Sequence, residues 1–546
     1  MASPMTTASI AAPGFYGLNT QDSSVTLSSG FALKAQNCII DKAGRIGARR
    51  GWSKVNAVNT DLGSAAVELM FELVDGGANT IISAGNNKLF TGRTTLTQKL
   101  VRNAANSANI TYTITANNWQ AAAMSYGDAN DFQPHAYLVQ AGHPALVYHE
   151  LPVSGGDPHD HDSGTFGFQQ VADIGTLPAN HSSSTFKPNT VLSAFGRIWM
   201  GDIVGDTQTV YFSDLLRGSD FTTGSAGFLN LQEVFPNGDP IVAMAAHNGF
   251  LIIFGRKNIA IYANPIDTSS LVLQDIIYNT GCIARDSVQN IGTDIIFLSD
   301  SGVRSLQRII QEKSLPMRDL SKNVRDDLMA NVDSETVANI KSIYFDREAF
   351  YLLSLPTTKY VYCFDTRGAL QDGSARVTIW DHIEPKSFCI TQAKELLIGK
   401  PGYIGKYGTY KDDTTTYRFQ YYTNYFDFDA PTKLKLLKKI NMVVIGGSNQ
   451  AVAVKWGFDY KDQYFAATRQ LGAAVSFEYN NTKVDTVPGF TEYNDAEYSS
   501  GIVLDKFITH AGGQGTVMQI GLETDIDDSP LSVQRIDVYI KQGKTV

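Results

Sequence analysis

The stretch Ile241–Ala263, IVAMAAHNGFLIIFGRKNIAIYA, constrains the fold more strongly than any other part of the chain. It holds three short apolar runs, and polar turns at His247–Gly249 and Gly255–Asn258 separate them. Asn-Gly between apolar runs predicts a tight hairpin, because both residues readily adopt positive φ angles. The three strands would have apolar side chains on both faces, so the unit must stack between other units of the same kind.

The same order of an apolar run, a polar turn and a second apolar run recurs at a spacing of roughly 40–55 residues. These units are Val67–Gly92, His135–Tyr148, Val191–Asp214, Val288–Leu306, Ile343–Asp365 and Trp380–Tyr407. Such spacing is typical of propeller blades, and it predicts a mainly β protein with a β-propeller of about six or seven blades. The alternative interpretation is an irregular all-β domain with ordinary hairpins.

The residues on either side of the repeats divide the chain into three parts. We expect residues 1–60 to form an N-terminal arm and hairpin, with its turn at Asp41–Gly44, and residues 61–415 to form the propeller. Residues 416–546 alternate aromatic and polar side chains over many short runs, the pattern of a β-sandwich. The sequence therefore predicts a sandwich-like platform that the C-terminal part builds together with the N-terminal segment.

Three insertions interrupt the predicted propeller, at residues 93–120, 150–187 and 314–332. Loops of this length are uncommon in compact domains unless they bind something or move. In the third insertion, Leu320, Val324 and Leu328 recur at helical spacing with charged residues between them, which predicts a helix over Ser314–Val332.

The overall charge argues against a protein that grips nucleic acid. Lysine and arginine number 45 against 54 aspartate and glutamate residues, a formal charge of −9. Tight nucleic-acid binding depends largely on neutralising phosphates, so this balance favours a surface along which DNA slides without being held.

Two groups of basic residues are nevertheless candidates for contact with an acidic partner or with DNA phosphate. The first group comprises Arg45, Arg49, Arg50 and Lys54, and the second comprises Lys433, Lys435, Lys438 and Lys439. The alternative interpretation is that both groups are solvated strand edges, whose charges block edge-to-edge pairing.

The four cysteines are Cys38, Cys282, Cys363 and Cys389, and none belongs to a CxxC pair. Three of them lie in or beside apolar runs, so we expect buried free thiols in a reducing compartment. The N-terminus lacks the basic start and apolar core of a secretory signal, and no apolar run approaches the ~20 residues of a membrane helix. We therefore expect a soluble protein without a membrane anchor that is made in the cytoplasm.

Candidate chemistry is sparse. His159 to Asp162, with Asp157 and His149 nearby, offers imidazole and carboxylate groups that suit a transition metal, but glycines flank the segment, and a solvated loop is the alternative. No nucleophile elbow, phosphate-binding loop or HExxH motif occurs. Carboxylates that could serve a glycosidase stand mostly where turns favour aspartate; they are Asp202, Asp214, Asp220, Glu348 and Asp381. We predict no catalytic residue, metal or cofactor, and no enzymatic activity.

Three stretches carry a resemblance to a known family. They are GFALKAQNCIIDKAGRIGARRGW at Gly30–Trp52, TVYFSDLLRGSDFTT at Thr209–Thr223 followed by the blade-like segments around Asn248 and through GCIARDSVQNIGTDIIFLSDSGVRSL, and the strand-rich end from Tyr417. Together they resemble the tail nozzle proteins of short-tailed bacteriophages, also called tail tubular protein B, whose relatives appear as packaged-DNA stabilisation proteins.

The resemblance implies a structural virion protein of the tail. It implies a homohexameric tube that docks onto the adaptor ring below the portal, carries tail fibres or spikes, retains packaged double-stranded DNA and conducts it during ejection without reading its sequence. The family offers no catalytic or cofactor residues to carry over.

A function from another class remains open. A carbohydrate-binding or glycan-cleaving propeller used for receptor recognition would expose aromatic rings for stacking on sugars. The candidates are Trp52, Trp119, Trp199, Trp380 and Trp456, although single tryptophans in strand-like units are more often part of the core. A cellular propeller scaffold is a third alternative.

Overall fold

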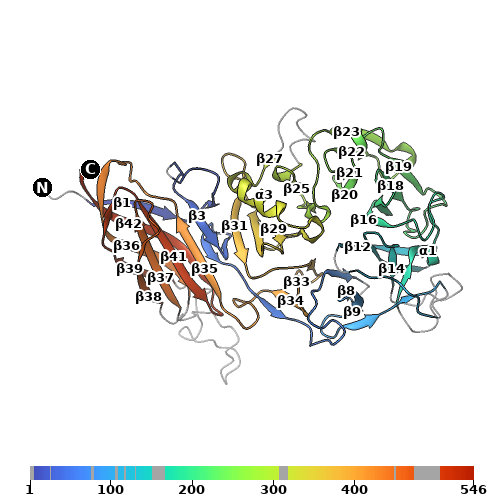
Figure 1. Ribbon diagram of the computed structural model, residues 1–546, viewed down its shortest axis with the longest axis horizontal. Helices are drawn as coiled ribbons and strands as arrows, with labels where there is room; N and C mark the ends of the chain where they lie inside the picture. Colours follow the sequence, from blue (N-terminus) through green and yellow to red (C-terminus); the bar gives the residue numbers. More distant parts are fainter. Residues whose placement is uncertain are drawn as a thin grey trace, which may run out of the picture.

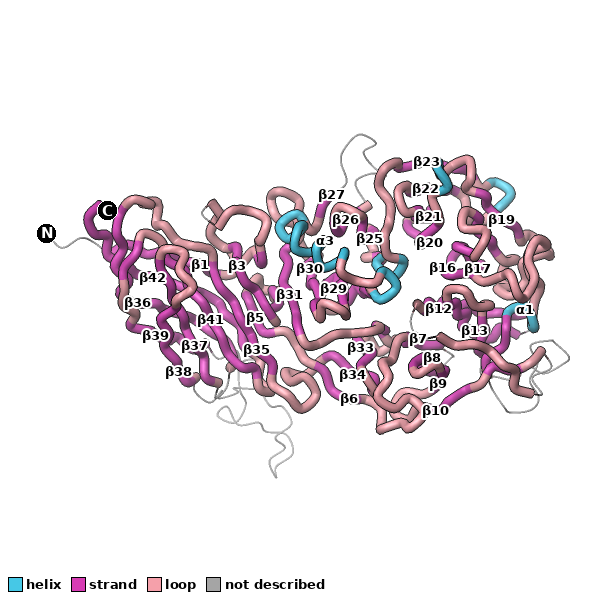
Figure 2. Tube along the Cα trace, viewed as in Figure 1, coloured by secondary structure: helices cyan, strands magenta, loops and turns pink. Residues whose placement is uncertain are grey.

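A computed structural model of the chain describes residues 5–24, 26–74, 79–104, 108–115, 118–128, 131–149, 167–306, 318–447, 450–471 and 504–545. The molecule is elongated, with a ring of small sheets at one end and two larger packed sheets at the other (Figure 1). Both termini lie at the end with the large sheets. Strands dominate throughout and helices are few and short (Figure 2), which confirms the predicted mainly β class.

In the part of the chain that the structure describes, six small sheets are blades of a β-propeller. The strands of each blade are given in sheet order. The first blade consists of β10 (Thr97–Lys99), β9 (Lys88–Thr91), β8 (Thr80–Gly85) and β7 (Leu69–Leu73), and the second consists of β11 (Val101–Arg102), β15 (Phe168–Gln170), β14 (Leu146–Tyr148), β13 (Asp131–Gln140) and β12 (Trp119–Asp128). The third consists of β16 (Pro188–Ala194), β17 (Arg197–Ile203), β18 (Thr209–Phe212) and β19 (Gly227–Asn230). The blade that follows consists of β20 (Ile241–His247), β21 (Phe250–Gly255), β22 (Ile259–Ala263) and β23 (Val272–Ile277), and the next one consists of β24 (Gln289–Asn290), β25 (Ile295–Ser299), β26 (Gly302–Ser305) and β27 (Arg318–Asp319). The last of the small sheets consists of β32 (Phe388–Ile390), β33 (Leu396–Lys400), β34 (Tyr403–Tyr407) and β6 (Trp52–Lys54).

One end of a ten-stranded sheet supplies a further blade of the ring. Its strands, in sheet order, are β28 (Lys341–Phe345), β29 (Phe350–Leu355), β30 (Tyr360–Asp365), β31 (Arg376–Asp381), β2 (Gly17–Leu18), β3 (Phe31–Gln36), β35 (Tyr417–Thr423), β41 (Met518–Ile526), β37 (Ala451–Phe458) and β38 (Tyr464–Gln470). The innermost strands touch in the order β7, β12, β16, β20, β24, β28, β32 and back to β7. The predicted propeller of six or seven blades is therefore confirmed, and β28–β31 belong to it and to the platform at once.

The stretch around Asn248 folds as the sequence predicts. Asn248 and Gly249 have φ angles of 49° and 80°, and they join β20 to β21 with His247 opposite Phe250. Leu251 packs toward the preceding blade, and Ile252 packs toward the following one. Both faces of the sheet are thus covered, which is why an isolated unit of this kind could not persist in water.

The platform is a sandwich of two sheets. The seven-stranded sheet consists of β39 (Leu504–His510), β36 (Lys433–Gly446), β42 (Leu531–Thr545), β5 (Ile46–Ala48) and β4 (Cys38–Ile40), with β1 (Met5–Ala11) beside β42 and β40 (Gln514–Gly515) beside β36. Its apolar face, with Ile440 and Ile536, shares one core with Tyr421 and Ile520 of the ten-stranded sheet. N-terminal and C-terminal strands build this sandwich together, as predicted.

The N-terminal segment serves both parts of the molecule. Its hairpin, β4 and β5, turns at Asp41, whose carboxylate accepts the backbone N–H groups of Ala43 and Arg45. A few residues later, β6 pairs with β34 as the outer strand of the last blade. The ring is therefore closed by a strand from the beginning of the chain.

The predicted helix over Ser314–Val332 is only partly found. Residues 307–317 lie outside the described residues, and Arg318–Asp319 form strand β27, which pairs with β26. The helix α3 spans Arg325–Asp333 and follows the 3-10 helix η4 (Lys322–Val324). Arg318 and Asp319 are extended and not helical because strand β26 pairs with them.

The remaining helices among the described residues are short; they are α1 (Val171–Ile174), η1 (Pro236–Gly238), η2 (Thr268–Ser270), η3 (Arg285–Ser287) and η5 (Val337–Asn339). Over the described ranges, no helix has both the length and the apolar character that crossing a membrane requires. The four cysteines are buried free thiols, as predicted.

Candidate functional site

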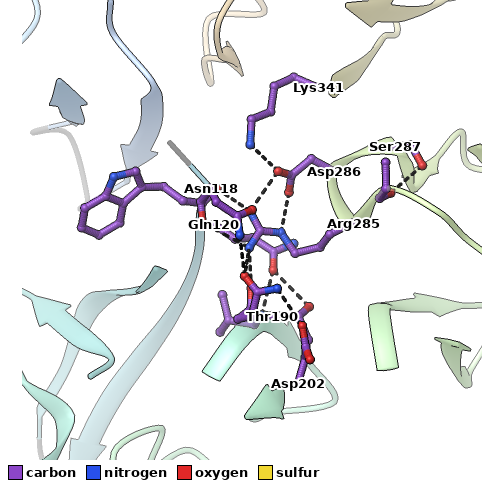
Figure 3. Close-up of polar contacts among 12 residues, drawn as sticks. Asn118, Gln120, Thr190, Asp202, Arg285, Asp286, Ser287 and Lys341 are labelled. Carbon is purple, nitrogen blue, oxygen red and sulfur yellow. Dashed lines mark hydrogen bonds and ion pairs between the residues drawn. The ribbon is translucent and has the colours of Figure 1, made fainter. Parts of the chain in front are cut away.

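Three charged side chains lie in contact among the inner strands of the propeller. The short helix η3 places Arg285 and Asp286 next to Lys341, the first residue of β28 (Figure 3). The Arg285 Nε atom lies 2.8 Å from Asp286 Oδ1, its Nη2 lies 2.9 Å from Oδ2, and Lys341 Nζ lies 2.5 Å from the same Oδ2. We call these three residues the axial cluster.

Arg285 also connects neighbouring blades. Its Nη2 donates to the Trp119 carbonyl at 2.8 Å, and its Nη1 donates to the Asn189 side-chain oxygen at 3.0 Å. Asn118 donates from its amide to the same Asn189 oxygen at 2.9 Å. The guanidinium has five donors in a rigid fork, so one side chain can hold η3 against both β12 and β16.

Gln120 makes a second polar connection between strands β12 and β16 of neighbouring blades. The side-chain oxygen of Gln120 accepts hydrogen bonds from the Thr190 hydroxyl at 3.1 Å and from the Val191 backbone N–H at 2.8 Å (Figure 3). Asn189 donates to Asp202 at 2.7 Å. Burial raises the pKa of Asp202, although this hydrogen bond and the Arg285 charge act in the opposite direction.

The electrostatics of the axial cluster are those of a structural ion pair. Burial disfavours the charged form of Asp286, but the charges and hydrogen bonds of Arg285 and Lys341 outweigh it and lower the Asp286 pKa to about 2. Burial lowers the pKa of Lys341, and Asp286 acts against this shift. A general acid or base needs a pKa near the working pH and a free lone pair or proton. Asp286 has both oxygens engaged, so it suits neither role.

A cavity of about 220 Å³ lies beside the axial cluster. Besides the cluster itself, its walls include Glu68, Trp119, Gln289 and Phe388, from the inner parts of several blades. The cavity is below the range of about 300–1,000 Å³ that is usual for small-molecule sites. The arrangement is suited to fixing blades relative to one another.

In the first group of predicted partner-facing residues, Arg49 is buried, and the other three are partly or fully exposed but paired with acidic side chains. Arg49 is completely buried and forms a bidentate pair with Asp412, so the prediction that it faces a partner or DNA is wrong. Arg45 pairs with Asp41 at 2.6 Å, and Arg50 pairs with Glu348 at 3.1 Å. The structure gives each of these arginines an acidic partner within the chain.

Lys54 completes the first group. Its Nζ atom lies 2.8 Å from Asp413 and 4.3 Å from the centre of the Tyr403 ring. The hydrogen bond to Asp413 raises the pKa of Lys54. Its ammonium group is therefore neutralised on the propeller surface beside β34.

The lysines of the second group have different environments along β36, whose register shifts between Lys433 and Lys435 and between Leu437 and Lys439. Lys435 is buried, and its ammonium donates to the carbonyls of Ala430 and Thr516, so the prediction that it faces a partner or DNA is also wrong. Burial lowers its pKa. Lys433 and Lys438 are exposed, and Lys439 lies over the Tyr539 ring at 4.4 Å.

The other candidates from the sequence do not form a reactive site among the described residues. Asp214 and Asp220 accept backbone and hydroxyl hydrogen bonds of local turns, which outweigh burial and lower the pKa of each. Over the same ranges, no three histidine, cysteine or acidic side chains are grouped so that they could hold a metal ion. His159 and His161 lie outside the described residues, whereas His149 is buried against His135.

The tryptophans are part of the core. All five are buried, with exposed fractions from 0% to 8%; they are Trp52, Trp119, Trp199, Trp380 and Trp456. None of them can stack on a sugar in solution. The glycan-binding alternative therefore loses the aromatic residues on which it depended.

Sequence reasoning missed the axial cluster. The only signal was that Arg285, Asp286 and Lys341 stand at the edges of apolar blade segments. A charged residue in such a place is ordinarily solvated. Only the packing of one blade against the next brings η3 and β28 together.

The fold defines this chain as a β-propeller protein with an attached β-sandwich. No protein-family profile matches it, and no curated protein matches it either. Similar solved structures include PorZ, a surface component of the type-IX secretion system of Porphyromonas gingivalis, with a TM-score of 0.36 and 10% identity over 65% of this chain. They also include the Pan2 WD40 domain of Neurospora crassa, with a TM-score of 0.36 and 7% identity over 66% of this chain and 96% of that domain. The match spans only 37% of PorZ. Likenesses this distant carry no argument about function.

Proposed function

We propose that this chain is a structural subunit of a phage tail nozzle, six copies of which surround a channel for double-stranded DNA. The observation that carries the proposal is the way the chain is divided. N-terminal strands β1 and β3–β5 build the platform together with the C-terminal strands, while β6 completes the propeller. This is the architecture that the sequence resemblance leads us to expect, a propeller body on a platform made from both ends of the chain.

The internal polar contacts support a rigid wall element. The axial cluster fixes several blades, and the pair of Arg49 with Asp412 fixes the N-terminal hairpin to the segment after the last blade. Buried pairs with complete hydrogen bonding make a structure specific and stiff. A tube that retains packaged DNA under load needs such stiffness and has no need of a reactive centre.

The distribution of basic side chains supports a channel that does not hold DNA. Five of the eight candidate basic residues are paired or buried within the chain; they are Arg45, Arg49, Arg50, Lys54 and Lys435. Fixed phosphate contacts from six subunits would multiply and stop the DNA from sliding. The proposal therefore includes passage of genomic DNA without sequence-specific binding, with the adaptor ring and tail fibres or spikes as further partners in the virion.

The test is negative-stain microscopy of the purified full chain over a range of concentrations, with glycan-array binding measured on the same preparation. We expect six-fold ring particles with an axial hole and no saturable glycan binding. A monomer with saturable glycan binding would overturn the proposal in favour of receptor recognition.

A further inference from the structure

The strand β1 leaves an unprotected edge on the platform. Each of its residues pairs with β42, from Met5 opposite Lys541 to Ala11 opposite Arg535, and no described strand pairs with its other side. The strand MTTASIA contains no charged residue and no proline. Proteins ordinarily block such edges with lysine, proline or a bulge, because an open edge recruits another strand.

A cavity lies along this same edge. It measures about 480 Å³ and is lined by consecutive residues of β1, Thr6–Ser9, and by two loops, Thr26–Ser29 and Asn424–Asp429. Its only charged side chains are the carboxylates of Asp427 and Asp429. The strand edge therefore borders an open slot that carries negative charge and hydroxyl groups.

On the opposite side of the platform, strands β39 and β38 are the edges of the two sheets, and they carry exposed apolar and basic side chains. In the described part of the chain, β39 pairs only with β36, and β38 pairs only with β37. Ile508 on β39 and Phe465 on β38 are 40% and 55% exposed. Lys506 and Arg469 are exposed beside them, and the Arg469 guanidinium donates to the Ile508 carbonyl at 2.8 Å. The Arg469 guanidinium thus covers one backbone acceptor of β39, and it must turn away before another strand can pair at that position.

We propose that β1 of one copy pairs with β39 of the next copy, so that the seven-stranded sheet continues from subunit to subunit. The two edges belong to the same sheet. Asp427 and Asp429 lie near one of them, and Lys506 of β39 and Arg469 of the neighbouring strand β38 lie near the other, where Asp505 is the acidic residue of β39. In each strand, alternate residues face the platform core, with Ile10 and Thr509 buried. Joining the strands in register therefore extends one buried face and one solvent face.

The geometry of this contact fits a ring. Edges on opposite sides of one sheet make a head-to-tail interface, which repeats and closes into a ring when the rotation per subunit allows it. Strand addition is a common mode of recognition, because backbone hydrogen bonds supply affinity and flanking side chains supply specificity. The inference rests on the proposed function in one respect, namely that copies of this chain assemble around an axis.

Cysteine cross-linking tests the contact directly. Thr7 and Ile508 are exposed on the solvent faces of β1 and β39. We expect oxidised Thr7→Cys/Ile508→Cys chains, or Thr7→Cys/Lys506→Cys chains if the register differs, to give a ladder of covalent oligomers on a denaturing gel. The matched control is Thr7→Cys/Val204→Cys, because Val204 is 67% exposed on the propeller, away from both edges. The native cysteines are all buried and give little background.

Edge variants supply a second measurement. Thr7→Lys gives β1 a charged side chain of the kind that blocks pairing at strand edges. We expect it to raise the protein concentration needed for assembly at least about tenfold. Asp429→Asn removes one charge of the slot, and Asp528→Asn is its control, because both aspartates are exposed and have φ angles near 55°. Unchanged thermal unfolding of each variant establishes that it folds.

The outcomes separate this inference from the nozzle proposal. If the Thr7→Lys variant still forms rings and neither cysteine pair gives a ladder of covalent oligomers, the contact between β1 and β39 is overturned while the nozzle proposal stands. If the cysteine pairs give the ladder but microscopy shows open filaments in place of rings, the nozzle proposal is overturned while the strand contact stands. Monomers without a ladder at every concentration overturn both, and rings that lose their assembly on Thr7→Lys support both.

Discussion

The Arg49 guanidinium and the Asp412 carboxylate form a bidentate ion pair inside the protein, with nitrogen–oxygen distances of 2.8 and 2.7 Å. Arg49 also donates to the Asn37 side chain at 2.8 Å and lies 4.1 Å from the centre of the Tyr417 ring. The pair joins the N-terminal hairpin to the segment that connects the last blade to the platform. Arg49, which the sequence suggested as part of a docking surface, instead connects two segments of the chain.

Removing one partner of this buried pair should be strongly destabilising. We expect Arg49→Ala to lower the free energy of unfolding by about 3–5 kcal/mol, because the Asp412 charge would remain buried without its partner. The measurement is a urea titration followed by fluorescence. Arg45→Ala, which breaks a partly exposed pair with Asp41, is the control and should lose about 0–1 kcal/mol. Equal losses in the two variants would contradict the structural role of Arg49.

The axial cluster should make stability depend on pH in the acid range. The folded protein holds the Asp286 pKa at about 2, below its ordinary value of 3.8, so folding favours the charged form. The resulting stabilisation is present above pH about 4 and is lost as the pH falls toward 2, a contribution of about 2 kcal/mol. Asp286→Asn should remove this part of the pH dependence in unfolding titrations at pH 2 to 6.

A charge-neutral variant of the same region is the control. Ser342 donates its hydroxyl to the Asp286 carbonyl at 2.8 Å. We expect Ser342→Ala to lower stability by about 1 kcal/mol at every pH, because it removes a hydrogen bond and leaves the charges in place. A change of slope in this variant would mean that the acid dependence arises elsewhere.

The chain should bind free duplex DNA weakly or not at all at physiological salt. Of the predicted lysines on β36 only Lys433 and Lys438 are exposed, which gives this strand few phosphate contacts, and the net charge of −9 opposes tight binding. A gel-shift titration checks this expectation. Nanomolar affinity that Lys433→Ala/Lys438→Ala abolishes would show that β36 is a DNA-binding surface and would argue against the sliding channel.

The native protein should react slowly with thiol reagents. Burial raises the pKa of Cys282 to about 11 and that of Cys389 to about 12, while Cys38 and Cys363 are also buried with raised pKa values. The thiolate is the reactive form, so both burial and the raised pKa values suppress labelling near neutral pH. We expect four thiols to react promptly in denaturant and fewer than one to react promptly in the folded protein. Fast labelling of the native chain would mean that a blade opens readily.

The sequence by itself determined the local units of this protein. Asn248-Gly249 specifies its hairpin because both residues tolerate the positive φ angles of the turn, and the apolar run Phe250–Phe254 requires cover on both faces. Such information resides in neighbouring residues, so the blades, the Asp41 hairpin and the burial of the tryptophans could be predicted without a structure.

Only the tertiary structure decided which distant segments meet. Arg49 and Asp412 are 363 positions apart, β6 completes a blade whose other strands lie more than three hundred residues later, and β28–β31 belong to the propeller and the platform together. Alternation and charge runs along the sequence did not show that Arg49 and Lys435 turn inward, because their burial depends on acceptors supplied by remote backbone and side chains. The partner of a strand or of a buried charge is a property of the closed ring, and no local pattern in the sequence encodes it.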